Sequence, residues 1–228
     1  MSFKKEDSSL DEKRLVQEML KSFLSILFEI TKGASINPSA NVNVMLYNSK
    51  KIPNGLERKY SCVITSPPYA NRISYVREVR PYMYWLGFFD NSKQAGDLEW
   101  DATGGTWGSA TSRLSTWTSS GLFASDSDFI ETIEQINLKS PILANYVHRY
   151  FEDMHSHFSG LHMILKPNAK LHYIIGNSKF YDVIVPSEEL YANMLRENGF
   201  TDVKIEMLRQ RSSKKELFEY LVSATWNG

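Results

Sequence analysis

The stretch from Cys62 to Arg72 constrains this chain more than any other part of its sequence. An apolar run, Cys62-Val63-Ile64, leads through one threonine into the polar corner Ser66-Pro67-Pro68-Tyr69. Proline fixes φ at about −65° and lacks a backbone donor, so two consecutive prolines end a strand and stiffen the turn that follows. The residue before a proline is driven into the extended region. The sequence therefore predicts a rigid ledge, residues Ser66–Tyr69, at the end of a strand, where open α/β sheets bind ligands.

Length and composition fit one folded domain, which we expect over residues 1–228. The formal net charge is +0, with 42% hydrophobic and 23% charged residues, which argues against a wholly basic nucleic-acid coat and leaves room for a local basic face. A single cysteine excludes an intramolecular disulfide and a cysteine-rich zinc site and fits a reducing cytosol, so we expect a cytoplasmic protein without a metal. We expect no membrane association, because no apolar run approaches the length of a membrane span.

The N-terminal region predicts a helix and then a strand. Between residues 10 and 32, apolar residues recur at spacings of three and four, and a second set widens the stripe. A face this broad fits either a core helix or a helix that packs against a partner chain. Alternation from Val42 to Tyr47 predicts a strand, and residues 60–65 predict the strand that leads into the ledge.

A change in composition follows the ledge. The segment from Ile73 to about Phe89, rich in aromatic and arginine residues, predicts a helix. Residues 90–128 are rich in glycine, serine and threonine and form an insert too long for an ordinary connector. Its tryptophans (Trp100, Trp107 and Trp117) argue against simple disorder, so base recognition, a lid and a subunit contact remain equal alternatives for it.

The remaining third of the chain shows regular periodicity. Two helices are expected, over residues 143–165 and from Pro186 to Gly199, with a strand at 170–176 between them. Two alternating runs with a basic connector then predict an antiparallel hairpin, over residues 202–208 and 217–225.

Ser66-Pro67-Pro68-Tyr69 after a short apolar strand resembles the catalytic motif of the amino-methyltransferases, which methylate exocyclic amines of DNA bases with S-adenosylmethionine. The serine variant, followed by Ala70-Asn71-Arg72, is most similar to the cytosine-N4 enzymes; aspartate and asparagine variants are commoner in adenine-N6 enzymes. The resemblance spans roughly residues 42–225. It implies a Rossmann-like α/β fold with a mostly parallel sheet, helices on both faces and a C-terminal antiparallel hairpin.

The resemblance also assigns roles to residues of the ledge. Ser66 Oγ and the Pro67 carbonyl would accept hydrogen bonds from the base amine, with Pro68 completing the motif. Tyr69 would stack on a base flipped out of the duplex, and its alternative is a core tyrosine. Asn48 and Ser49 stand where the family often has Gly-Asp near the cofactor, although a capping turn is an equal alternative.

Residues that follow the ledge are candidates for contact with DNA. Asn71, Arg72 and Tyr75 could touch the target strand, and Arg72, Arg77 and Arg80 are candidates for phosphate contact, against the alternative of solvated helix charges.

One part of the family pattern is missing. The glycine-rich turn after the first strand, which lets the cofactor approach the backbone, has no equivalent, and neither has the acidic residue that holds the ribose. Two interpretations follow: one half of a split methyltransferase completed by a second subunit, or a degenerate relative that has lost cofactor binding. A non-catalytic DNA-binding or scaffolding subunit and an RNA methyltransferase are the alternative functions.

Overall fold

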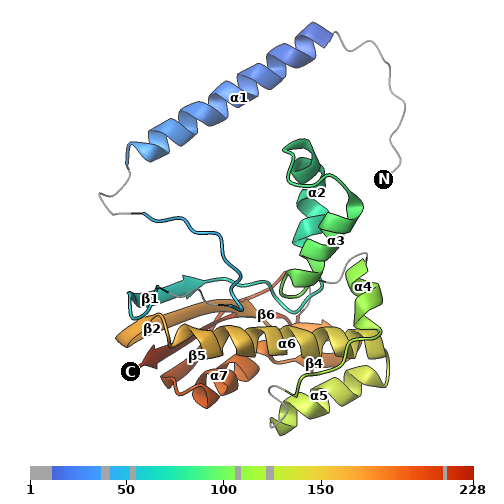
Figure 1. Cartoon of the computed structure of the whole chain (residues 1–228), viewed down its shortest axis with the longest axis vertical. Coiled ribbons are helices and arrows are strands. Elements are labelled where there is room, and N and C mark those ends of the chain that lie inside the picture. Colours follow the sequence, from blue (N-terminus) through green and yellow to red (C-terminus); the bar gives the residue numbers. More distant parts are fainter. Residues whose placement is uncertain (1–11, 37–41, 52–54, 106–108, 122–125, 213–214) are drawn as a thin grey trace. The chain divides into compact units, whose positions relative to one another are not determined.

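The computed structural model describes residues 12–36, 42–51, 55–105, 109–121, 126–212 and 215–228 (Figure 1). The chain divides into two compact units, residues 1–46 and residues 47–228, and each is described by itself. The expectation of one domain over the whole chain stays a prediction. Among the described helices, none is long and apolar enough to cross a membrane.

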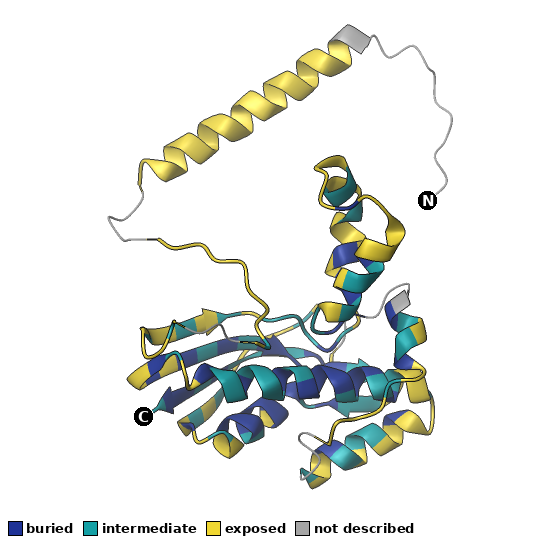
Figure 2. Ribbon diagram, in the orientation of Figure 1, coloured by how far each residue is buried: buried dark blue, intermediate teal, exposed yellow. Residues whose placement is uncertain are grey.

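Among its described residues the first unit contains one helix, α1 (Glu12–Ala34), which confirms the helix expected from the periodicity of residues 10–32. Its apolar side chains are exposed, from Leu27 at 44% to Phe28 at 65% (Figure 2). No other described element of this unit covers them. The choice between a core helix and a partner-facing helix therefore stays open.

The strand predicted from Val42 to Tyr47 is wrong. This segment has no strand or bridge, and Val44 and Leu46 are 90% and 99% exposed. Alternating residues form a strand only when a neighbouring strand takes up their backbone hydrogen bonds, and the described residues of the first unit contain no strand.

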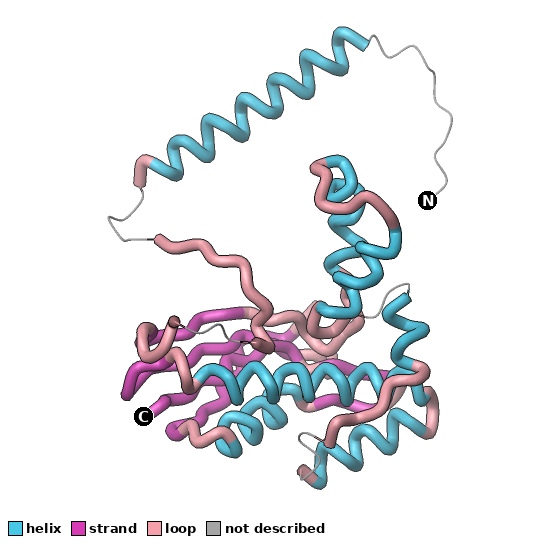
Figure 3. Tube along the Cα trace, viewed as in Figure 1, coloured by secondary structure: helices cyan, strands magenta, loops and turns pink. Residues whose placement is uncertain are grey.

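The second unit holds the sheet and the remaining helices (Figure 3). Its elements in chain order are β1 (Tyr60–Thr65), α2 (Tyr75–Trp85), α3 (Ser92–Asp101), α4 (Ser109–Leu114), α5 (Ser127–Asn137), α6 (Pro141–Leu161), β2 (Leu165–Gly176), β3 (Ser178–Phe180), β4 (Val183–Val185), α7 (Ser187–Glu197), β5 (Thr201–Gln210) and β6 (Phe218–Trp226). The strand before the ledge and the C-terminal hairpin are confirmed, as are the helices predicted at 73–89, 143–165 and 186–199, although α6 begins earlier than predicted, at Pro141.

The main sheet is mixed, with the strand order β1-β2-β6-β5. Only β1 and β2 run parallel, with Ile64 opposite His172, whereas β6 is antiparallel to both β2 and β5. The prediction of a mostly parallel sheet is therefore wrong for the described strands. The physical reason is that α6 supplies the crossover that parallel neighbours need between β1 and β2, whereas the hairpin closes through a short connector and must be antiparallel.

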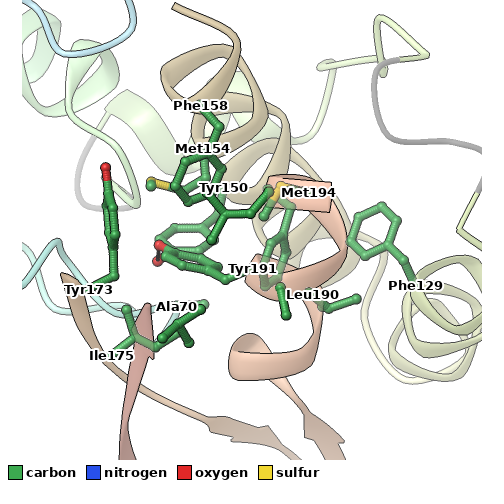
Figure 4. Close-up of a cluster of buried hydrophobic side chains, with 14 of the residues drawn as sticks. Ala70, Phe129, Tyr150, Met154, Phe158, Tyr173, Ile175, Leu190, Tyr191 and Met194 are labelled. Atoms are coloured by element: carbon green, nitrogen blue, oxygen red, sulfur yellow. Dashed lines mark hydrogen bonds between the residues drawn. The ribbon is translucent and has the colours of Figure 1, made fainter. Parts of the chain in front are cut away.

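Helices α6 and α7 pack on one face of this sheet and against each other. Aromatic rings form the contact: Phe158 of α6, Tyr173 of β2 and Tyr191 of α7 are all 0% exposed, with centroids 5.2 Å apart for Phe158–Tyr173 and 5.3 Å for Phe158–Tyr191 (Figure 4). Such edge-to-face rings contribute to the stability of the core beyond their buried area.

The opposite face of the sheet is open within the second unit. Ile64 on β1 is 76% exposed, Lys170 is exposed, and His172 and Ile174 on β2 are only partly buried. The prediction of helices on both faces is therefore wrong for the described part of this unit, because both helices that contact the sheet lie on the Tyr173 face.

The insert is ordered where it is described. Helix α3 lies beside α2, with Phe89 packed between Val76 and Ala95, and α4 follows. The guanidinium of Arg149 on α6 stacks 3.9 Å from the centroid of the Trp100 ring, which ties α3 to the core. Trp107 lies outside the described residues. The described part of the insert therefore contains helices α3 and α4, which are linked to α6 through Trp100 and through α4.

Candidate functional site

The ledge lies directly after β1, as its prolines predicted. Ser66 is exposed, and Pro67, Pro68 and Tyr69 are partly buried. Ala70, which follows, is 0% exposed and belongs to the main core. The ledge is thus anchored at both ends while the Ser66 side chain faces solvent.

Two tyrosines of α6, Tyr146 and Tyr150, form hydrogen bonds with the backbone of the ledge and of the turn that follows it. Tyr150 Oη donates to the Pro68 carbonyl at 2.7 Å and lies 2.7 Å from Tyr191 Oη (Figure 4). Tyr146 Oη accepts from the backbone N–H of Arg72 at 3.0 Å, where the chain turns with a φ of 62°. Burial raises the pKa of Tyr146 to about 12 and that of Tyr150 still further, so both hydroxyls stay protonated at neutral pH. These bonds fix the backbone on which the ledge residues stand.

The Tyr69 ring lies against the end of β2. A Cβ placed on Gly176 would come within 2.9 Å of two carbons of that ring, so only glycine permits this approach. On the ring lies the guanidinium of Arg211, 5.5 Å from the centroid. Burial raises the pKa of the Tyr69 phenol, and the nearby Ser66 side chain opposes that rise. Whether Tyr69 stacks on a base stays a prediction.

Asn177, the residue after β2, ties the C-terminal hairpin to the ledge. Its side-chain oxygen accepts from the Phe218 N–H at 2.8 Å, and its side-chain amide donates to the Glu216 carbonyl at 3.1 Å. Its own carbonyl accepts from Arg211 Nη1 at 3.2 Å. Because of these bonds, a basic residue of the hairpin connector is held over Tyr69 instead of extending into solvent.

Asn48 and Ser49 form a tight turn. Asn48 Oδ1 accepts from the Lys50 N–H at 3.0 Å, and the Ser49 carbonyl lies 2.9 Å from His157 Nδ1. His157 Nε2 in turn lies 2.7 Å from Tyr173 Oη, and burial lowers the pKa of this histidine.

This turn does not form a cofactor cradle by itself. The Asn48 side chain is occupied by the turn, and both residues are exposed. Among the described residues beside the ledge, we find no glycine-rich turn after a strand that would admit a cofactor backbone contact. The assignment of Asn48 and Ser49 to cofactor binding stays a prediction, and we derive no chemical step through them.

The residues proposed to contact DNA are partly brought together. Asn71, Arg72 and Arg77 line a pocket of about 670 Å³, whereas Tyr75 is 56% exposed and does not line it. Asn71 and Arg72 also line a second pocket of about 410 Å³.

Exposed apolar side chains continue along α2 beyond these pockets. Tyr82 and Trp85 on the helix are 63% and 82% exposed, and Phe88 just after it is 69% exposed.

In the part of the chain that the structure describes, no group of three or more His, Cys, Asp or Glu residues could hold a metal ion.

Three residues of this site had no signal in the sequence. Arg211 belongs to a run that the sequence indicates as an exposed basic turn. Glu219 belongs to the last predicted strand, and it accepts a hydrogen bond from Arg209 Nε at 2.6 Å. Tyr150 reads as one of several apolar residues on a helix. Only the three-dimensional fold brings these residues to the ledge, more than 80 positions away in the sequence.

Comparison with known proteins adds one match. No protein-family profile and no curated protein matches the chain. Among solved structures, it is similar to a candidate DNA modification methylase from Thermus thermophilus, with 15% sequence identity and a TM-score of 0.31. The likeness covers 35% of this chain and 37% of that one. An overlap of this size defines neither fold nor function, so the site residues carry the proposal that follows.

Proposed function

We propose that this chain is a subunit of a site-specific DNA methyltransferase that transfers a methyl group from S-adenosylmethionine to an exocyclic base amine, with cytosine N4 as the favoured target. The observation that carries the proposal is the ledge Ser66–Tyr69, which follows a strand of a parallel pair and is anchored by Tyr150. Its sequence resembles the amino-methyltransferase motif.

The ledge presents acceptors suited to an amine. The Ser66 side chain is exposed. Tyr150 donates its hydrogen bond to the carbonyl of Pro68, and the carbonyl of Pro67 is a separate acceptor. An amine conjugated to a base ring is a poor nucleophile, and acceptors on its two protons draw the nitrogen toward tetrahedral geometry and localise its lone pair. Rigid placement of such acceptors is the main contribution that a protein can make to this transfer.

Tyr69 provides a flat surface beside these acceptors. One edge of its ring, carbons Cδ2 and Cε2, lies against Gly176, and the Arg211 guanidinium lies 5.5 Å from the ring centroid. The amine of a paired base is out of reach inside the duplex, so the target base has to leave the stack and lie against such a surface. In this proposal Tyr69 receives the flipped base while Ser66 and Pro67 engage its amine.

A second polypeptide completes the proposed site. The described residues form no cofactor cradle beside the ledge, and two apolar surfaces suit a partner. One is the exposed face of α1; the other is the outer edge of β1, which among the described strands pairs only with β2 and exposes Ile64. An apolar parallel strand at a sheet edge is a site for pairing with another chain.

The test is cofactor-dependent methyl transfer. The chain would be co-produced with the protein of a neighbouring reading frame that carries a glycine-rich cofactor motif, and incorporation of labelled methyl groups into DNA would be measured. Ser66→Ala should lower the transfer rate by about 10²–10³-fold, by analogy with the loss of one preorganised polar contact. Ser127→Ala, an exposed serine on α5, is the matched control and should leave the rate unchanged.

Full activity of Ser66→Ala would contradict the proposed mechanism. Labelling of RNA in place of DNA would support the RNA methyltransferase alternative. DNA binding without methyl transfer in the complex would support a non-catalytic DNA-binding or scaffolding subunit.

A further inference from the structure

The pocket of about 410 Å³ beside the ledge has the lining of an anion site. Its lining residues include the three cations Arg72, Lys179 and Arg211, together with Asn71 and Ser178, and no carboxylate. They come from three separate places in the chain: the turn after the ledge, strand β3, and the connector of the C-terminal hairpin. The volume lies within the range of sites that hold a small ligand group.

A buried hydroxyl in this pocket lacks a partner. Ser178 is 2% exposed, and its Oγ makes no hydrogen bond to any described residue. The backbone at this point is fixed by the β3–β4 hairpin, where Ser178 pairs with Val185. A buried hydroxyl without a partner is unfavourable, so an oxygen atom of a ligand in the pocket would satisfy it.

Two of the cations are held in place by neighbouring groups. Arg211 Nη1 donates to the Asn177 carbonyl, which leaves its other N–H groups for a ligand. Lys179 Nζ lies 2.5 Å from Glu216 Oε2, an exposed carboxylate that does not line the pocket. Glu216 therefore competes with a ligand anion for Lys179. Glu219, which forms an ion pair with Arg209, is also near Arg211, but neither carboxylate lines the pocket.

Arg211 connects the pocket to the ledge. The same guanidinium that lines the pocket lies 5.5 Å from the centroid of the Tyr69 ring, and Asn71 donates its backbone N–H to the Tyr69 carbonyl at 2.7 Å. A base on Tyr69 would thus have its own sugar-phosphate within reach of these cations.

We propose that this pocket binds a phosphate group of the DNA strand that carries the target base, with Ser178, Lys179 and Arg211 as ligands in addition to Asn71 and Arg72. The inference rests on the proposed function and extends it to residues of β3 and the hairpin connector. Arginine and lysine beside a hydroxyl donor are the usual partners of a phosphate.

The experiment is fluorescence-anisotropy titration of a labelled DNA duplex with the full chain over a series of salt concentrations. Lys179→Gln should weaken binding by about tenfold and lower the salt dependence by about one phosphate contact. Glu216→Gln should act in the opposite direction and tighten binding by about twofold, because it frees Lys179. Ser178→Ala should weaken binding without changing the salt slope. Lys204→Gln, which removes the same charge from an exposed position on β5, should have no effect.

Equal weakening by Lys179→Gln and Lys204→Gln would overturn the inference, as would an unchanged affinity in Glu216→Gln. A separate titration with inorganic phosphate distinguishes the source of the anion. Displacement of DNA only by phosphate in large excess supports a backbone phosphate, whereas tight binding of inorganic phosphate without DNA binding would overturn it. Loss of methyl transfer in Ser66→Ala with normal DNA binding keeps the test of the proposed function separate.

Discussion

The two faces of the main sheet differ in how completely they are covered. On one face, Tyr173 of β2 is sealed by rings from α6 and α7, and the same helix α6 anchors the ledge through Tyr150. On the other face, Ile64 and Lys170 are exposed within their unit, and β1 has a free outer edge among the described strands. Parallel strands normally lie with both faces covered. The difference is that the face packed by α6 and α7, the same α6 that anchors the ledge, is completed within this unit, whereas the opposite face stays exposed there.

The largest effect is expected where the covered face is densest. Phe158→Ala removes a ring that contacts both Tyr173 and Tyr191 and should lower the free energy of unfolding by about 3–5 kcal/mol. Urea denaturation followed by circular dichroism measures it. A loss below about 1 kcal/mol would contradict the difference between the two faces, because the covered face would then be loosely packed.

A smaller effect is expected at the bond that joins the core to the ledge. Tyr150→Phe leaves the Pro68 carbonyl and the Tyr191 hydroxyl without this partner, and should cost about 1–3 kcal/mol in unfolding free energy. The matched control is Tyr181→Phe, at an exposed tyrosine, which should be neutral. Equal stability of both variants would show that Tyr150 does not anchor the ledge.

A fall in pH should lower the free energy of unfolding, by less than the two substitutions above. Burial lowers the pKa of His157, and burial likewise lowers that of His148, so the unfolded chain binds protons at a higher pH than the folded chain. Stability contributed by neutral histidine is present above the usual histidine pKa and decreases as the pH falls through it, by at most about 1.4 kcal/mol per pH unit for each group. His157→Gln should flatten the pH dependence of the unfolding free energy between about pH 7.5 and 5.5. An unchanged slope would contradict a lowered pKa for His157 in the folded chain.

The smallest effect on stability is expected on the open face. Ile64→Ala should change the unfolding free energy of the isolated chain by less than about 0.5 kcal/mol, because the side chain is 76% exposed. The same variant should weaken assembly with the partner, as measured by size-exclusion chromatography of the mixture. A large decrease in the unfolding free energy of the isolated chain would show that this face is already covered.

Local pattern predicted much of the fold. The double proline located the end of β1, composition located α2, and periodicity located α6, α7 and the terminal hairpin, because each of these signals depends on residues near in sequence. The strand expected from Val42 to Tyr47 did not form, because alternation alone does not supply a neighbouring strand. The mostly parallel sheet was inferred from the resemblance and not from strand pairing, which the sequence does not encode locally.

The candidate site also combines residues that are adjacent in the sequence with residues that only the fold brings together. Ser66–Tyr69 could be identified as a motif of adjacent residues, and their role in the reaction stays a prediction. Arg211 and Ser178 reach the ledge only through tertiary structure, since nothing in a basic turn or a single serine indicates a pocket. Residues that act together from distant elements are therefore the part that the sequence alone could not supply.

We propose that this chain carries the target-base half of a site whose cofactor half lies in another polypeptide. Isothermal titration of S-adenosylmethionine, first into the chain alone and then into its complex with the partner, tests it most directly. The account predicts a dissociation constant above about 1 mM for the chain alone and binding in the range of about 1–100 μM for the complex. Micromolar binding by the chain alone would contradict it.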